Sequence, residues 1–176
     1  MVDPRHGLTN LLTGFGYNLY DTKNRARADD LLVREKAAER IADAANFIRG
    51  LRTAYHRRYI PTPSRENPDP PPERLEQLRT LARVHQRLAD LDTDIRGMAV
   101  PTQDRVWEHF RGESSLLNQL LLFDYRLVSS CQTVSDRVAG LGPSDWNDET
   151  AADFERALDD VERVARQRRD FLSVPG

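Results

Sequence analysis

Hydrophobic residues recur at steps of three, four and seven positions along four stretches of the chain. This spacing places apolar side chains on one stripe of an α-helix, and it predicts helices over about 17–60, 72–96, 102–139 and 147–172. The second stripe consists of Leu75, Leu78, Leu81, His85, Leu88, Leu91 and Ile95. No segment alternates between apolar and polar residues as a strand does, so the pattern predicts an all-α protein.

Proline and glycine mark the connections between these helices. Residues 61–72 are rich in proline, which lacks the backbone N–H that a helix interior needs. Gly97 and Pro101 end the second helix, and Gly112 with the two serines that follow can break the third. Short connections make consecutive helices antiparallel. We therefore expect an elongated antiparallel up-down-up-down four-helix bundle over residues 17–176, preceded by a short N-terminal helical arm over residues 1–16.

Composition fits a single domain in a reducing compartment. The 176 residues are 39% hydrophobic, enough to form a core without a disulfide or a metal, and their formal net charge is −2. Cys131 is the only cysteine, which excludes an intrachain disulfide and favours the cytoplasm. No apolar run reaches the roughly 18–20 residues of a membrane span, so we expect no membrane partner. The balanced charge disfavours nucleic acid as a partner.

The sequence lacks the motifs of familiar metal and cofactor sites. It contains no Glu-x-x-His pair of the kind found in di-iron bundles, no Cys-x-x-Cys-His haem motif and no glycine-rich phosphate loop after a strand. The four histidines lie on separate segments of the chain: His6, His56, His85 and His109. We therefore predict no cofactor and no metal, and we favour a function that is not enzymatic.

An arginine followed by a histidine after four to six residues offers one enzymatic alternative. Arg79 and His85 are separated by five residues, and Arg49 and His56 by six. This spacing resembles the nuclease motif of HEPN domains, which are also small helical bundles. The resemblance implies a metal-independent ribonuclease or an RNA-binding bundle, with Arg79 and His85 as its catalytic pair.

Two polar residues interrupt apolar stripes and form a candidate buried polar pair. His85 falls within the stripe of the second predicted helix, and Asp124 lies inside the apolar run of the third. A buried carboxylate needs a partner, such as an arginine or His85 itself. In the alternative, His85 is a hydrogen-bonded core residue and Asp124 lies on the exposed edge of its helix.

Residues 15–30 combine aromatic, amide and charged side chains where the apolar stripe is weak. Aromatic residues mixed with arginine are typical of protein interfaces. The predicted partner-binding residues are Phe15, Tyr17, Tyr20, Asp21, Asn24, Arg25 and Arg27. The alternative is that the aromatic residues fold back as a cap on the open end of the bundle. We thus predict an interaction or scaffold module that binds a protein partner or itself.

Overall fold

The computed structural model describes residues 8, 20, 26–60, 62, 69–99 and 104–173. Over these ranges the chain is helical and contains no strand, so the prediction of an all-α protein is confirmed for them. The helices are α2 (Ala26–Tyr59), α3 (Pro72–Arg96), α4 (Asp104–Gly112), α5 (Ser114–Ala139) and α6 (Asp148–Ser173).

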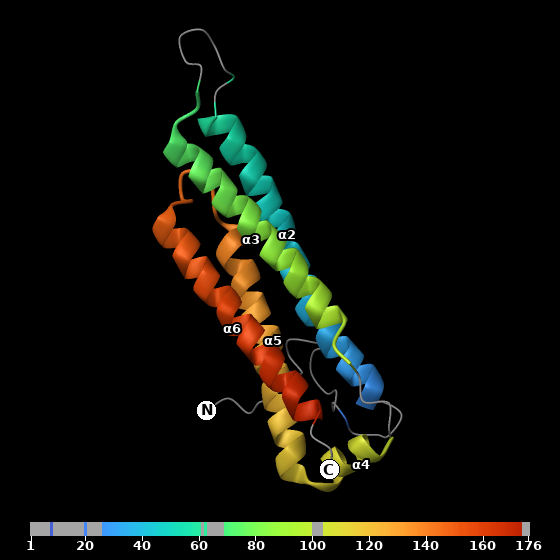
Figure 1. The fold of residues 1–176 in the computed structure, drawn as a ribbon. Coiled ribbons are helices and arrows are strands. Elements are labelled where there is room, and N and C mark those ends of the chain that lie inside the picture. The colour runs from blue at the N-terminus through green and yellow to red at the C-terminus, as the bar shows by residue number, and fades with distance from the viewer. Residues whose placement is uncertain are drawn as a thin grey trace.

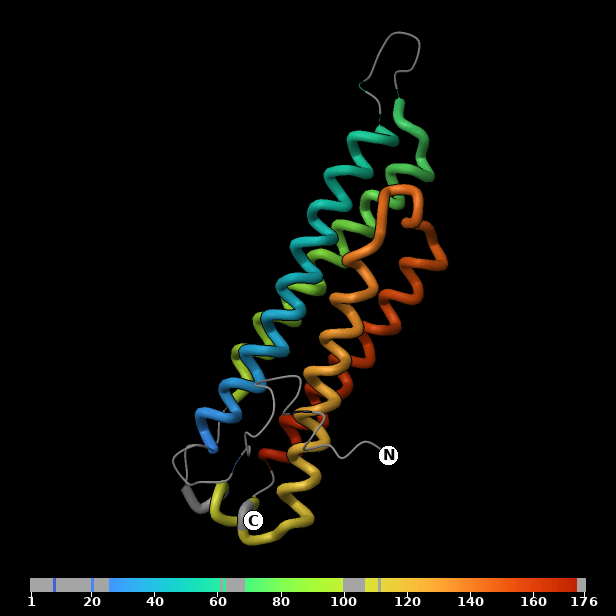
Figure 2. Tube along the Cα trace, turned by 180° about the vertical axis from the view of Figure 1, so that it is seen from behind, coloured from blue at the N-terminus to red at the C-terminus, as the bar shows by residue number. Residues whose placement is uncertain are grey.

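Four long helices lie lengthwise beside one another and give an elongated shape (Figure 1). α2 packs against both α3 and α5, α5 packs against α6, and α3 touches α6. The colours of Figure 2 show that α2 and α3 run in opposite directions, as do α5 and α6. The short helix α4 packs on α5 at the end of the molecule where α5 begins.

The stretch predicted as helical over 102–139 forms two helices, divided at the break that Gly112 and the serines allow. α4 ends at Gly112 and α5 begins at Ser114, because Glu113 between them has an extended backbone with φ −115° and ψ 106°. The break falls where glycine and two serines weaken helix propensity, as the sequence indicated. Within the described residues the first long helix begins at Ala26, and apart from Tyr20 the predicted stretch 17–25 lies outside those residues.

Local sequence explains where two of the helices begin. Pro72 is the first residue of α3, a position where the missing N–H of proline costs no hydrogen bond. α6 begins after Asn147, whose side-chain oxygen accepts the backbone N–H of Thr150 at 2.9 Å. Acidic side chains in the first turn of both helices complement the positive end of the helix dipole.

The apolar stripes meet in one core, and aromatic rings close its α4 end. Tyr20 stacks on Trp107 with ring centroids 5.9 Å apart. The Trp107 ring lies tilted against the Phe110 ring, with centroids 6.4 Å apart. Phe110 in turn packs on Phe171 of α6 at 5.3 Å. Leu8, the one described residue of the predicted N-terminal arm, is helical and buried. Residues from before α2 therefore contribute to the core.

Candidate functional site

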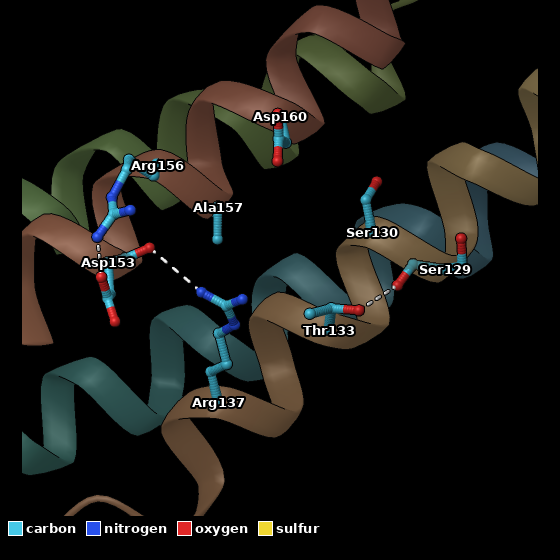
Figure 3. Close-up of a pocket in the computed structure, with 8 residues that line it drawn as sticks. All are labelled: Ser129, Ser130, Thr133, Arg137, Asp153, Arg156, Ala157 and Asp160. Atoms are coloured by element: carbon cyan, nitrogen blue, oxygen red, sulfur yellow. Dashed lines mark hydrogen bonds and ion pairs between the residues drawn. The ribbon is translucent and has the colours of Figure 1, made fainter.

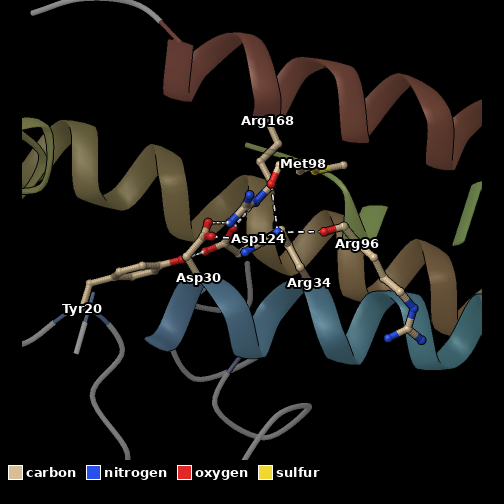
Figure 4. Close-up of polar contacts among 7 residues, drawn as sticks. All are labelled: Tyr20, Asp30, Arg34, Arg96, Met98, Asp124 and Arg168. Atoms are coloured by element: carbon tan, nitrogen blue, oxygen red, sulfur yellow. Dashed lines mark hydrogen bonds and ion pairs between the residues drawn. The ribbon is translucent and has the colours of Figure 1, made fainter. Parts of the chain in front are cut away.

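A network of charged side chains lies in the interior between α2, α5 and α6 (Figure 4). Arg168 of α6 donates from Nε to Asp124 Oδ1 of α5 at 2.6 Å, and from Nη2 to Asp30 Oδ1 of α2 at 2.6 Å. All three side chains are fully buried. The Arg168 guanidinium thus links α6 to both α2 and α5.

Arg34 extends this network to the end of α3. Its Nε donates to Asp30 Oδ2 at 3.1 Å, and its Nη1 donates to the carbonyls of Met98 at 2.9 Å and Arg96 at 3.1 Å. The carboxylate of Asp30 therefore lies between two guanidinium groups, one from its own helix and one from α6. The first turns of α2 are fixed to both neighbours by these bonds.

Tyr20 closes the network from outside the long helices. Its hydroxyl donates to Asp124 Oδ2 at 2.7 Å, and its backbone N–H donates to Asp29 Oδ2 at 2.6 Å. Its backbone lies in the left-handed region with φ 63°, which a residue other than glycine adopts only where its surroundings hold it. The two hydrogen bonds and the stacking on Trp107 supply that constraint.

Burial and neighbouring charges together shift the pKa values of this network. Burial raises the pKa of the Asp124 carboxyl, while the charge and hydrogen bond of Arg168 act in the opposite direction. Burial lowers the pKa of the Arg168 guanidinium, but the charges of Asp124 and Asp30 outweigh it and the pKa lies above its ordinary value. Burial and the charge of Asp124 raise the pKa of Tyr20 well above its ordinary value. Tyr20 therefore stays a hydrogen-bond donor at neutral pH.

The network binds its own members and positions helices. Each Asp124 oxygen accepts a bond from within the chain, and Asp30 accepts from both arginines. Only Arg168 Nη1 is buried without a hydrogen-bond partner among the network atoms of the described residues. Buried ion pairs of this kind fix geometry at a cost in desolvation. We therefore assign the network a structural role.

An apolar groove between α2 and the C-terminal end of α5 is the stronger candidate for binding. We call it the Phe47 groove. Its volume is about 510 Å³. On α2 it is lined by Asp43, Asn46, Phe47, Gly50, Leu51 and Ala54. The other wall consists of Val138 in the last turn of α5 and of Leu141 and Pro143 just after that helix. Phe47 is 47% exposed, although a phenylalanine in a monomer is usually buried.

Gly50 lies at the centre of this surface. A Cβ placed on Gly50 would have no atom within 4 Å, so the backbone of α2 is open to solvent there. A second, more polar hollow of about 450 Å³ shares Asn46, Gly50 and Ala54 and continues to Arg49, Thr53 and Arg57. The exposed face of α2 is therefore apolar on one side of Gly50 and basic on the other.

A third hollow, of about 570 Å³, lies between α5 and α6 and is polar (Figure 3). The hydroxyls of Ser129, Ser130 and Thr133 donate to carbonyls of their own helix at 2.9 to 3.2 Å. Arg137 donates to the carbonyl of Asp153 at 3.3 Å, and Arg156 pairs with the carboxylate of the same residue. These polar groups are engaged within the protein, so this hollow offers a weaker site than the Phe47 groove.

Of the candidate polar pair, Asp124 lies in the interior and His85 is half-buried. Asp124 is buried, so the alternative that placed it on an exposed edge was wrong. Its two carboxylate oxygens are bonded to Arg168 and Tyr20, whereas His85 is half-buried on α3. The partner that the sequence did not identify is Arg168. Arg168 lies seven residues after Val161 and three after Ala165, on the apolar stripe of α6. This position of an arginine on an apolar stripe is the sequence feature that could have identified it as buried.

Two of the predicted partner-binding residues lie in the described part of the chain. Tyr20 is 1% exposed and points into the protein, as the alternative of a cap would place it. Arg27 is exposed in the first turn of α2. The others lie outside the described residues, and their role stays a prediction: Phe15, Tyr17, Asp21, Asn24 and Arg25.

The HEPN-like spacing places Arg79 and His85 on different faces of one helix. Arg79 and His85 lie six positions apart on the continuous helix α3, which turns their side chains about 120° from each other. Arg79 is exposed and pairs with Glu76 at 3.3 Å. Arg49 and His56 are both exposed on α2, and Arg49 donates to Asn46 at 2.9 Å.

The chain matches no protein-family model, and comparisons with curated proteins and with solved structures likewise give no match. None of the described helices combines the length and apolar character that crossing a bilayer requires. Within the described residues, no three histidine, cysteine or acidic side chains gather as a metal-binding group would.

Proposed function

We propose that this chain is a non-enzymatic interaction or scaffold module that binds a protein partner or a second copy of itself through the Phe47 groove. The observation that carries the proposal is an exposed phenylalanine beside an open apolar groove. Interfaces use a few large aromatic anchors that fill pockets and lose contact with water. Apolar grooves on a protein surface mark such sites more often than isolated exposed residues do.

The long helices would serve as a rigid platform for this surface. We propose that α2, α3, α5 and α6 form an up-down-up-down four-helix bundle. The ionic network around Arg168 would hold α2 in register with α5 and α6, and so would keep the two walls of the groove in place. A groove built on packed helices needs little ordering when a partner binds, which favours affinity.

A second contact region is proposed at the start of α2. Arg27 is exposed there, and it follows the predicted interface residues Phe15, Tyr17, Asp21, Asn24 and Arg25. Aromatic residues and arginine are enriched at interfaces. We also propose the cytoplasm as the location, because the single cysteine, Cys131, is a buried free thiol.

Photo-cross-linking in the living host tests the binding surface. A benzophenone amino acid at position 47 should form a covalent adduct with whatever occupies the groove. The matched control is position 31, because Leu31 is 46% exposed on the same helix and points about 160° away from Phe47. Adducts at 47 and none at 31 support the proposal. No adduct at 47, or equal adducts at both positions, would contradict it.

A further inference from the structure

We propose that the occupant of the Phe47 groove is a second copy of this chain, packed antiparallel along α2 about a two-fold axis beside Gly50. The inference rests on the function proposed above and names its partner. Three features of α2 support it. The backbone at Gly50 is open, and opposite charges lie at equal distances along the helix before and after Gly50. The two-fold axis also places Phe47 of one copy beside the groove of the other.

The centre of the face is shaped for close approach of another helix. Gly50 is exposed, and a Cβ built on it would meet nothing within 4 Å. Asn46 and Ala54 lie one turn before and one turn after it on the same face. A two-fold axis at Gly50 places Ala54 of one copy opposite Asn46 of the other, so no large side chain separates the two helices.

Charges on this face select the antiparallel arrangement. Asp43 and Arg57 lie seven residues before and after Gly50, each about 10.5 Å along the helix from it. Both line the hollows that meet at Gly50, and the Asp43 side chain is 46% exposed although Arg40 Nη1 of its own helix lies 3.6 Å from its Oδ2. Under the two-fold axis each Asp43 faces Arg57 of the partner copy. A parallel pairing would instead place Asp43 beside Asp43 and Arg57 beside Arg57.

Phe47 fits the groove of the partner copy in the same arrangement. It lies three residues before Gly50, about 4.5 Å along the helix. The two-fold axis moves it to about 4.5 Å beyond Gly50 of the other copy, between the levels of Leu51 and Ala54. Those two residues line the groove. Each copy would therefore insert its phenylalanine into the other, and one contact would fill both grooves, as isologous interfaces do.

Analytical ultracentrifugation of purified full-length chain tests this geometry. Wild-type protein should shift with concentration from the 20.2 kDa monomer toward twice that mass. Asp43→Arg should weaken the dimer at least tenfold, because it places two arginines opposite each other. Asp43→Arg combined with Arg57→Asp should restore it, because the swap recreates both pairs. Phe47→Ala should weaken dimerisation at least tenfold, and Leu31→Ala should leave it unchanged.

The outcomes separate this inference from the function it rests on. A wild-type chain that stays monomeric up to about 1 mM overturns the second copy as partner. If position 47 still cross-links to another protein, the interaction surface stands and only the identity of the partner changes. If the double charge swap does not restore the dimer, although circular dichroism shows that the variant keeps its helical content, the antiparallel pairing is overturned. A dimer restored by the swap supports it.

Discussion

Replacing Arg168 with methionine should destabilise the protein more than any exposed charge substitution. The Arg168 side chain is fully buried, and its two 2.6 Å ion pairs are with Asp30 and Asp124, which are also fully buried. Without the guanidinium, two carboxylates remain in the interior with less compensation. Breaking a buried ion pair in this way costs about 3–5 kcal/mol. That is a large share of the roughly 5–15 kcal/mol that holds a domain folded.

Urea unfolding followed by circular dichroism measures this loss. With a slope of about 2 kcal/mol per molar urea, Arg168→Met should lower the midpoint by about 2 M. Arg163→Met is the matched control, because Arg163 on the same helix makes an exposed 2.8 Å pair with Asp160. That pair should contribute at most about 1 kcal/mol. Equal losses for the two variants would refute the reasoning.

A compensating variant separates the lost charge from lost packing. Asp124→Asn, added to Arg168→Met, removes the carboxylate that loses Arg168, whereas Asp30 keeps its ion pair with Arg34. The double variant should recover part of the lost stability, because removing both members of a buried ion pair costs much less than leaving one charge unpaired. No recovery would indicate that the packing of the Arg168 stem, rather than its charge, accounts for the effect.

Three further predictions follow from burial. Because burial raises the pKa of Tyr20 well above 10, the unfolded chain releases this proton first as pH rises. This group should therefore lower the unfolding free energy by about 1.4 kcal/mol for each pH unit above pH ~10. In denaturant titrations Tyr20→Phe should remove that part of the pH dependence, and the same pH dependence in both proteins would count against the buried hydroxyl. Burial also raises the pKa of the Cys131 thiol, so Ellman's reagent should react with it only when the protein opens, and faster in Arg168→Met; reaction at the rate of a free thiol would contradict the fold. Leu88→Ala, in the core, should cost about 2–5 kcal/mol in urea unfolding, whereas Leu31→Ala should cost less than about 1 kcal/mol; similar costs would be inconsistent with their burial.

The helices could be predicted from sequence because each must bury one apolar stripe. The periodicity of α3 and α6 defined both elements, and their observed ranges agree closely with the predicted ones. The same periodicity continues across Glu113, and this is why the sequence predicted one long helix there. A local backbone change at one residue left no trace in the apolar pattern, although Gly112 and the serines indicated where it falls.

The sites depend on contacts that sequence spacing does not contain. Asp124 stood out as an acid in an apolar helix, but its partner Arg168 lies 44 residues further on, and Asp30 lies 138 residues before Arg168. Ile48 lies on the apolar stripe of α2 and is buried, as its spacing indicates, whereas the groove beside the exposed Phe47 forms only where α2 meets the end of α5. Local periodicity finds helices, whereas the network and the groove require the helices to be assembled.

The most direct test of the central claim asks whether Phe47 leaves water when the protein binds. A fluorinated phenylalanine at position 47 reports its surroundings by 19F NMR. The account predicts a single exposed resonance in dilute protein and a shifted, broadened one as the chain concentration rises. A resonance that stays at its exposed position at every concentration, and also in extract from the protein's own host, would show that Phe47 is not a binding residue.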